Sequence, residues 1–415
     1  MQSAATCLLI LLGGAGCVLA ADETPRNLLA TPYAEWKLGP SKSADYFPIA
    51  VWLQQPKYAT RYKAAGINLY IGLWKGPTEQ QLATLKAAKM PVICSQNAVG
   101  LKYKDDPLIV AWMHGDEPDN AQRIGRHWKT AEQIAEAWPG LPKKPLAKWG
   151  TYGPPIPPKY IIANYKTIKQ RDPSRPVVLN LGQAVAWDGY IGRGVRSRHP
   201  EDYPEYIKGC DVVSFDIYPV VHRKPQIAGK LWYVPRGVER LRRWTKDEKA
   251  VWNCIECTRI SNVKVKPTPA QARSEVWMAI IHGSRGLVYF VHQFKPRFND
   301  NALLDDAEML KAVTALNKRI HSLAAVINSP TVDDAVTVKS SNAATPVKTM
   351  TKKHGGATYV FAAAMRDKPT TGTFVVKGVG DATADVLGED REVAVKGGSF
   401  TDTFDGCGVH LYKIK

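Results

Sequence analysis

The sequence has no apolar run long enough to cross a membrane. Its most apolar stretch, Leu8–Leu12, is far shorter than the roughly 20 residues that a spanning helix needs. The chain also contains no P-loop, no dinucleotide-binding glycine pattern and no second Cys pair or His at zinc-finger spacing. These absences exclude a membrane span, and we expect neither a cofactor nor a bound metal.

The sequence is also poor in negative charge. Its 38 Asp and Glu residues stand against 56 Lys and Arg residues, which gives a net charge of +18. Such an excess suggests an acidic partner. No nucleic-acid-binding module is recognisable, and the export signal described below argues against nucleic acid as the partner.

The remaining composition is that of a globular protein. Hydrophobic residues make up 45% of the chain and charged residues 23%, which excludes disorder and a coiled coil as the main state. At about 150 residues per domain, 415 residues predict two or three domains, although an eightfold α/β barrel uses about 250 residues as one.

Residues 1–20 are typical of a cleaved signal peptide. Leu8–Leu12 form its apolar core, and Val18-Leu19-Ala20 provide a small-x-small cleavage site before Ala21. No basic residue precedes the apolar core, and Cys17 leaves a lipid anchor as the alternative, although Gly14 stands where a lipoprotein signal has Leu or Val. We therefore expect a secreted or periplasmic protein, with lipid anchoring as the less favoured reading.

Cleavage at this point leaves five cysteines, Cys94, Cys210, Cys254, Cys257 and Cys407. An odd number in an exported chain means at least one free thiol or an intermolecular bond. Cys254 and Cys257 have CxxC spacing, but we interpret them as small apolar side chains in a strand.

From about residue 46 the chain alternates between short apolar runs and longer amphipathic stretches. Continuous apolar character is typical of strands buried on both faces of a parallel sheet. Helices are predicted in between, for example after the capping residue Thr78, from Pro158, and from Thr268-Pro269. The predicted strands are Phe47–Leu53, Ile67–Leu73, Pro91–Ser95, Ile109–Met113, Val177–Leu181, Asp211–Ile217, Ala250–Ile255 and Leu287–Val291.

Eight such βα units predict a (β/α)8 TIM barrel over residues 46–330, preceded by an N-terminal lead at 21–45. Residues 331–415 have few helix signals and show alternating runs separated by glycine pairs. We predict a small antiparallel β-sandwich there. That segment holds 11 basic and 10 acidic residues, so nearly all of the excess charge belongs to the barrel and its lead.

Two glutamates end two of the predicted barrel strands. The fourth strand runs into His114-Gly115-Asp116-Glu117-Pro118, and the seventh ends at Glu256. Barrel enzymes place their chemistry at this end of the strands. A carboxyl pair across the mouth of a barrel has the groups that glycosidic cleavage needs, namely a proton donor and a nucleophile or base.

With these two glutamates on an eightfold barrel and a sandwich behind it, the chain resembles the clan-A glycoside hydrolases over most of residues 46–415. The resemblance implies a retaining reaction, with Glu117 as acid/base and Glu256 as nucleophile. It also implies that Tyr218, after the sixth strand, hydrogen-bonds the nucleophile. The chain departs from the clan at Asp116, where an Asn that binds the substrate is usual.

Each glutamate has an alternative structural interpretation. Glu117 fits a carboxylate at the start of a helix, because acidic side chains favour first helical turns. Glu256 fits a buried carboxylate paired with an arginine such as Arg259.

Sugar sites combine flat aromatic faces with a few fixed polar groups. Trp187 is the preferred platform, because it follows the fifth strand in a glycine-rich loop. The candidates for substrate binding at strand ends and in rim loops are Asp116, Trp52, Trp74, Gln96, Asn180, Gln183, Trp187 and His292.

Arginines gather in the loop Gly192–His199, which holds Arg193, Arg196 and Arg198, and Arg223 follows the sixth strand. Guanidinium groups on this rim pair well with sulfate or carboxylate. We therefore predict that Arg196 and Arg198 bind an anionic substrate, with charge that serves solubility as the alternative.

Together these features predict a secreted retaining glycoside hydrolase that cleaves a sulfated, uronate-bearing or neutral poly- or oligosaccharide. The alternative is a non-catalytic carbohydrate-binding protein on the same scaffold. The sequence does not define the sugar, the linkage or the oligomeric state.

Overall fold

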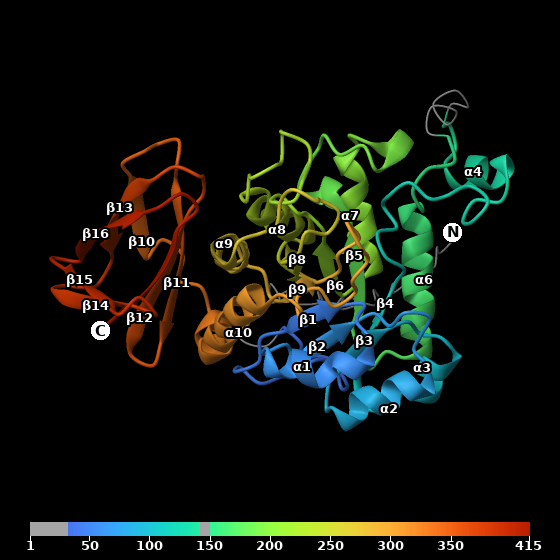
Figure 1. Ribbon diagram of the computed structural model, residues 1–415, viewed down its shortest axis with the longest axis horizontal. Helices are drawn as coiled ribbons and strands as arrows, with labels where there is room; N and C mark the ends of the chain where they lie inside the picture. Colours follow the sequence, from blue (N-terminus) through green and yellow to red (C-terminus); the bar gives the residue numbers. More distant parts are fainter. Residues whose placement is uncertain (1–31, 142–149) are drawn as a thin grey trace, which may run out of the picture.

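The structure is a computed structural model that describes residues 32–141 and 150–415. Nine parallel strand segments form one sheet in the order β7-β6-β5-β4-β3-β2-β1-β9-β8. Only Trp252 separates β7 from β8, so they are two parts of one strand path and the sheet closes into an eight-stranded barrel (Figure 1). The segments are β1 (Ile49–Trp52), β2 (Leu69–Ile71), β3 (Val92–Cys94), β4 (Ile109–Met113), β5 (Val177–Leu181), β6 (Val212–Phe215), β7 (Ala250–Val251), β8 (Asn253–Glu256) and β9 (Leu287–Phe290).

Helices surround this barrel. Short 3-10 turns lie at Pro56–Tyr58, Gln183–Val185, Gly194–Arg196, Pro200–Asp202 and Ile207–Gly209. The α-helices are α1 (Ala59–Ala64), α2 (Glu79–Ala87), α3 (Ala98–Lys102), α4 (Ala131–Ala137), α6 (Pro158–Arg171), α7 (Tyr203–Tyr206), α8 (Tyr233–Thr245), α9 (Pro269–Ile281), α10 (Ala307–Ser322) and α11 (Ala324–Asn328).

The predicted fold class is confirmed, and each of the eight predicted apolar runs contains a barrel strand. All five residues of β5 are buried, as expected for a strand covered on both faces. The helix starts follow their predicted caps: Thr78 and Gln81 form a capping box at α2, and Thr268 does the same at α9 with Gln271.

Helix α8 lies unusually close to the sheet. It carries Gly237, where an added Cβ would lie 2.2 Å from the ring of Phe215 on β6. Only glycine permits this approach without movement of the strand.

The residues after the barrel form two antiparallel sheets that face each other (Figure 1). The three-stranded sheet has the order β10-β13-β16, and the five-stranded sheet has the order β11-β12-β17-β14-β15. Phe374, Phe400 and Tyr412 pack between them. The strands are β10 (Val336–Ser340), β11 (Val347–His354), β12 (Ala357–Ala364), β13 (Thr370–Val376), β14 (Ala382–Val386), β15 (Arg391–Val395), β16 (Ser399–Phe404) and β17 (Val409–Ile414).

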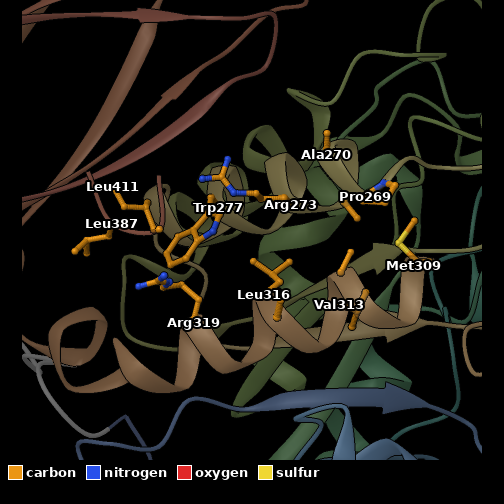
Figure 2. Close-up of a pocket in the computed structure, with 14 residues that line it drawn as sticks. Pro269, Ala270, Arg273, Trp277, Met309, Val313, Leu316, Arg319, Leu387 and Leu411 are labelled. Carbon is orange, nitrogen blue, oxygen red and sulfur yellow. The ribbon is translucent and has the colours of Figure 1, made fainter. Parts of the chain in front are cut away.

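The sandwich docks on α9. Trp277 lies 5.6 Å from the ring of Phe361, Arg273 donates to the carbonyl of Val409 at 3.0 Å, and Ser274 donates to that of Cys407 at 2.7 Å. Figure 2 shows a cavity of about 330 Å³ beside this contact, between α9, α10 and the loop after β14. The two domains are therefore joined by packed side chains and hydrogen bonds.

The five cysteines within the described residues are all free thiols, and Cys254 and Cys257 are buried as predicted. Within the described ranges, no helix is both long and apolar enough to cross a membrane. The predicted signal peptide at 1–20 lies outside the described residues.

Candidate active site

A tight turn follows β4 at the C-terminal mouth of the barrel. It carries three carboxyl groups, Asp116, Glu117 and Asp119, and Glu117 has a positive φ of 41°. This left-handed conformation is uncommon for a residue with a side chain, and the surrounding turn must hold it.

Asn180, near the C-terminal end of β5, joins two of the acidic side chains at this mouth. Its amide nitrogen donates to Asp116 at 2.9 Å and to Asp216, just after β6, at 3.1 Å. Its amide oxygen accepts from Ser214 at 2.7 Å. Because Ser214 fixes the orientation of the amide, the nitrogen faces the two carboxyl groups.

Tyr218 completes this group from the loop after β6. Its hydroxyl donates to the second oxygen of Asp216 at 3.0 Å. The resemblance implied that Tyr218 hydrogen-bonds the nucleophile, assigned there to Glu256, whereas in the structure its hydroxyl donates to Asp216 instead. We call Asp116, Glu117, Asp216, Asn180 and Tyr218 the mouth cluster.

The carboxyl groups of the mouth cluster raise one another's pKa. Burial and the nearby charge of Asp216 raise the pKa of Asp116 to about 7. Burial and the charges of Asp216, Asp116 and Asp119 hold the pKa of Glu117 well above its usual range.

Burial also raises the pKa of Asp216, and hydrogen bonds from Cys254, Asn180 and Tyr218 oppose part of that rise. Three donors thus favour the charged form of Asp216, whereas burial and the neighbouring carboxylates favour the neutral form of Glu117.

Asp119, fully buried behind the cluster, has a supporting position. Its carboxylate accepts from the amide of Gly182 at 2.8 Å and from the hydroxyl of Tyr203 at 2.8 Å. The buried guanidinium of Arg193 donates to the carbonyl of Asp119 at 3.1 Å. These contacts fix the turn after β4 against the loop after β5.

Among the described residues, Glu256 forms no hydrogen bond with a member of the mouth cluster. Its side chain has 0% exposure, and its two oxygens accept from the backbone amides of Val220 at 2.5 Å and Val221 at 2.9 Å. Burial raises its pKa to about 7, and its nearest carboxyl neighbour is the equally buried Glu275 of α9. The predicted alternative of a buried carboxylate fits this position, with loop amides rather than Arg259 as its partners.

The aromatic candidates divide into buried and exposed side chains. Trp52 is buried inside the barrel, and Trp187 packs between Tyr190 and His222. Trp74 is 67% exposed beside a cavity of about 350 Å³ that Gln54 also lines.

His292 is buried after β9 and lies 3.4 Å from Gln54. Its ring stacks with those of Phe294 and Phe298 at centroid distances of 6.2 and 6.4 Å. These two phenylalanines are 47% and 66% exposed, so they present an open aromatic rim.

The two glutamine candidates take different positions. Gln96 donates to the carbonyl of Ile168 in α6, which directs its amide toward the helix layer. Gln183 lies in the 3-10 turn after β5, and its side-chain oxygen is buried without a hydrogen-bond partner among the described residues.

The arginine-rich loop neutralises part of its own charge. Arg196 pairs with Asp202 at 2.5 Å and stacks on Trp138, while Arg193 pairs with the same carboxylate at 2.6 Å. Arg223 donates to the carbonyl of Ser261. Arg198 is exposed, and no ion pair forms at its side chain within the described part of the chain.

The sequence reasoning missed Asp216 and Phe298. Asp216 could have been found from its position, because it follows a barrel strand just as Asp116 does. Phe298 has no such signal, since the turn between Gln293 and Asn299 that exposes it is not evident in the sequence.

Neither protein-family models nor curated proteins give a match to this chain. Solved structures do. They include an alpha-amylase from Geobacillus thermoleovorans complexed with acarbose, at 12% identity and a TM-score of 0.50, over 90% of this chain and 98% of that chain.

A GH42 beta-galactosidase from G. stearothermophilus matches at 9% identity and a TM-score of 0.52, over 89% of this chain and 98% of that chain. A trehalulose synthase mutant in complex with Tris matches at 10% identity and a TM-score of 0.51, over 92% of this chain and 100% of that chain. At these identities the likeness shows a shared fold, which includes both the barrel and the β-domain behind it.

Proposed function

We propose that this protein is a glycoside hydrolase that cleaves a poly- or oligosaccharide with retention of configuration. The observation that carries the proposal is the mouth cluster, in which Asn180 joins two carboxyl groups beside a third whose pKa is raised by burial and by its acidic neighbours. The fold supports it, because proteins named as an alpha-amylase and a beta-galactosidase share it.

Glu117 serves as the general acid in this proposal. A carboxyl group whose pKa lies well above its usual range keeps its proton to higher pH, which suits it to donate to the leaving oxygen. Its strained turn directs it from the end of β4, where barrel enzymes carry catalytic groups.

Asp216 serves as the anion that faces the anomeric carbon. Tyr218 and Asn180 donate to its two oxygens and so fix the carboxylate in one orientation. An Asp216 oxygen bonds to the anomeric carbon as the glycosidic bond breaks, and the leaving oxygen takes the proton of Glu117. Water, deprotonated by Glu117, then releases the sugar and restores both groups.

This assignment differs from the role that family resemblance gives to Glu256. A nucleophile must reach the anomeric carbon, whereas Glu256 has no exposed surface and holds two loop amides. Those amides belong to the loop that carries Tyr218, so we propose that Glu256 positions the loop.

Export and an anionic substrate remain part of the proposal. The composition of residues 1–20 supports export. Exposed Arg198 supports an anionic substrate, whereas the ion pair of Arg196 with Asp202 weakens that support.

The test is hydrolysis of a panel of aryl glycosides and of neutral, sulfated and uronate-bearing polysaccharides. Once a substrate is found, Glu117→Gln and Asp216→Asn are expected to lower kcat/KM by about 10²–10⁴-fold, because each removes a group required in the transition state. NMR of the first product reads out retention directly.

Two variants sharpen the test. Asp188→Asn removes a carboxylate from the same rim that pairs with Arg236 and Arg240, and it should leave kcat/KM nearly unchanged. If Glu256→Gln instead loses as much as Asp216→Asn and keeps its fold, the nucleophile is Glu256. Binding of a polysaccharide without any hydrolysis would show a carbohydrate-binding protein instead of an enzyme.

A further inference from the structure

A second cavity lies at the opposite end of the barrel. It has a volume of about 450 Å³ and opens between the ends of α8 and α9, the start of β9 and strand β11 of the sandwich. A volume of this size is within the range of small-molecule sites.

Two cationic side chains that line this cavity bind backbone carbonyls rather than carboxylates. Lys352 on β11 is 1% exposed, and its ammonium group donates to the carbonyl of Ser329 at 2.5 Å. Arg285, before β9, donates to the carbonyl of Ile327 at 3.4 Å. Within the described residues, neither has a carboxylate at salt-bridge distance.

The other charges of the cavity are already engaged or lie farther away. Arg242 pairs with Asp247 at 2.6 Å, and His282 lies 3.5 Å from Glu239. Lys249 donates to carbonyls on the far side, those of Ile207 and Cys210.

Lys348 adds a further positive charge to the cavity. Besides Glu239 and Asp247, which are already engaged, Asp333 is the only acidic residue in its lining. A buried ammonium beside a guanidinium is costly unless a negative group joins them.

The pKa of Lys352 reflects this environment. Burial and the charges of Arg285 and Arg242 lower it to about 7, and Asp333 opposes the shift. His282 and Lys348 supply the remaining titratable or charged groups on that side of the cavity.

We infer that this cavity binds an oxyanion, namely the phosphate, sulfate or carboxylate group of a small molecule, between Lys352 and Arg285. The guanidinium offers a planar pair of donors that fits such a group, and the ammonium supplies a charge already stripped of water. The site is remote from the mouth cluster and does not depend on the proposed reaction.

Calorimetric titration with inorganic phosphate tests this inference, at constant ionic strength set with chloride. Wild-type protein should bind one phosphate saturably. Lys352→Met should weaken binding by about 10–100-fold, since a charge-assisted hydrogen bond contributes about 1.5–3 kcal/mol. Arg285→Gln should weaken binding similarly.

Lys353→Met is the matched control, because it removes the same charge from the next, exposed residue of β11 and should change the affinity less than twofold. Equal weakening in Lys353→Met, or no saturable binding to wild-type protein, would overturn the inference.

The proton balance of binding gives a second readout that overall folding does not mimic. An anion raises the pKa of Lys352, so phosphate binding at pH 7.5 should take up protons that Lys352→Met does not take up. Competition of sulfate and of glucuronate with phosphate shows whether the site prefers a phosphate, a sulfate or a carboxylate group. A sulfated polysaccharide that competes with phosphate would place the anion on a polymer, and failure of every anion to compete would refute a shared site.

Discussion

The two ends of the barrel concentrate charge of opposite sign. The mouth holds Asp116, Glu117 and Asp216, whereas the base holds Arg285 and Lys352. Burial, together with neighbouring like charge, moves a pKa at each end to about 7, upward for Asp116 and downward for Lys352.

The ends differ in how the repulsion is relieved. The mouth cluster relieves it internally, because a protonated Glu117 carries no charge. At the base, Lys352 can likewise become neutral by losing its proton, and an external anion offers the alternative of joining the two cations while both stay charged. A cluster that shares protons is suited to catalysis, whereas a cluster of unpaired cations is suited to binding.

The largest expected effect tests whether the mouth acts as one unit. Glu117→Gln combined with Asp216→Asn should lower kcat/KM little more than the worse single variant does, on the order of 10³-fold. The two groups act in the same step, so the loss of either one already removes most of the rate. Steady-state kinetics on one aryl glycoside measures all three variants. Losses that multiply would show two independent groups.

The next effect concerns Lys352 and the pH dependence of stability. Its pKa falls from 10.5 to about 7 on folding, so the unfolded chain binds more protons between these values and stability rises with pH across that window. Lys352→Met should remove a rise on the order of 4 kcal/mol between pH 7 and pH 10, since each pKa unit corresponds to about 1.4 kcal/mol. Urea denaturation from pH 6 to pH 10 measures it, and a slope identical to wild type would show that Lys352 stays fully charged.

A smaller effect is expected at the mouth. Asp116→Asn removes a negative charge beside Glu117 and should lower the pKa of Glu117. The alkaline limb of kcat/KM should then move to lower pH by about one unit, since neighbouring charges shift pKa values by about 1–3 units. If the alkaline limb of kcat/KM does not move, the charge of Asp116 does not affect the pKa of Glu117.

The smallest effect separates the two arginines of the rim loop. Arg198→Ala should raise KM for a sulfated or uronate substrate a few-fold and leave a neutral aryl glycoside unchanged, because exposed charges contribute roughly 0–1 kcal/mol. Arg196→Ala should mainly lower Tm, since its guanidinium pairs with Asp202. Equal KM changes for neutral and anionic substrates would contradict the prediction that Arg198 binds an anionic group of the substrate.

The strands of the barrel could be predicted because continuous apolar runs leave few alternatives to a sheet covered on both sides. Thr78 and Thr268 could be predicted as caps because capping depends on residues three positions apart. Both are local or repeated signals.

The position of Glu256 could not be predicted in this way. Its strand is interrupted at Trp252, and the amides that hold it belong to a loop that lies 35 residues earlier. The partner of Arg196, Asp202, likewise depends on how the loop folds back. Residue type and strand end therefore predict a candidate rim, whereas the contacts of each group on it depend on how distant loops pack.

The docking of the sandwich on α9 bears on how freely this architecture can be recombined. Arg273 and Ser274 bind the sandwich, and Glu275, the next residue of α9, lies against Glu256. Glu256 in turn holds the amides after Tyr218. A strain applied to the sandwich would therefore travel through one helix to the loop that carries Tyr218 of the mouth cluster. Grafting this barrel onto another C-terminal module should disturb the mouth cluster unless the new module meets α9 with similar contacts. The sandwich thus supports the proposed active site from behind, and the two domains form one structural unit.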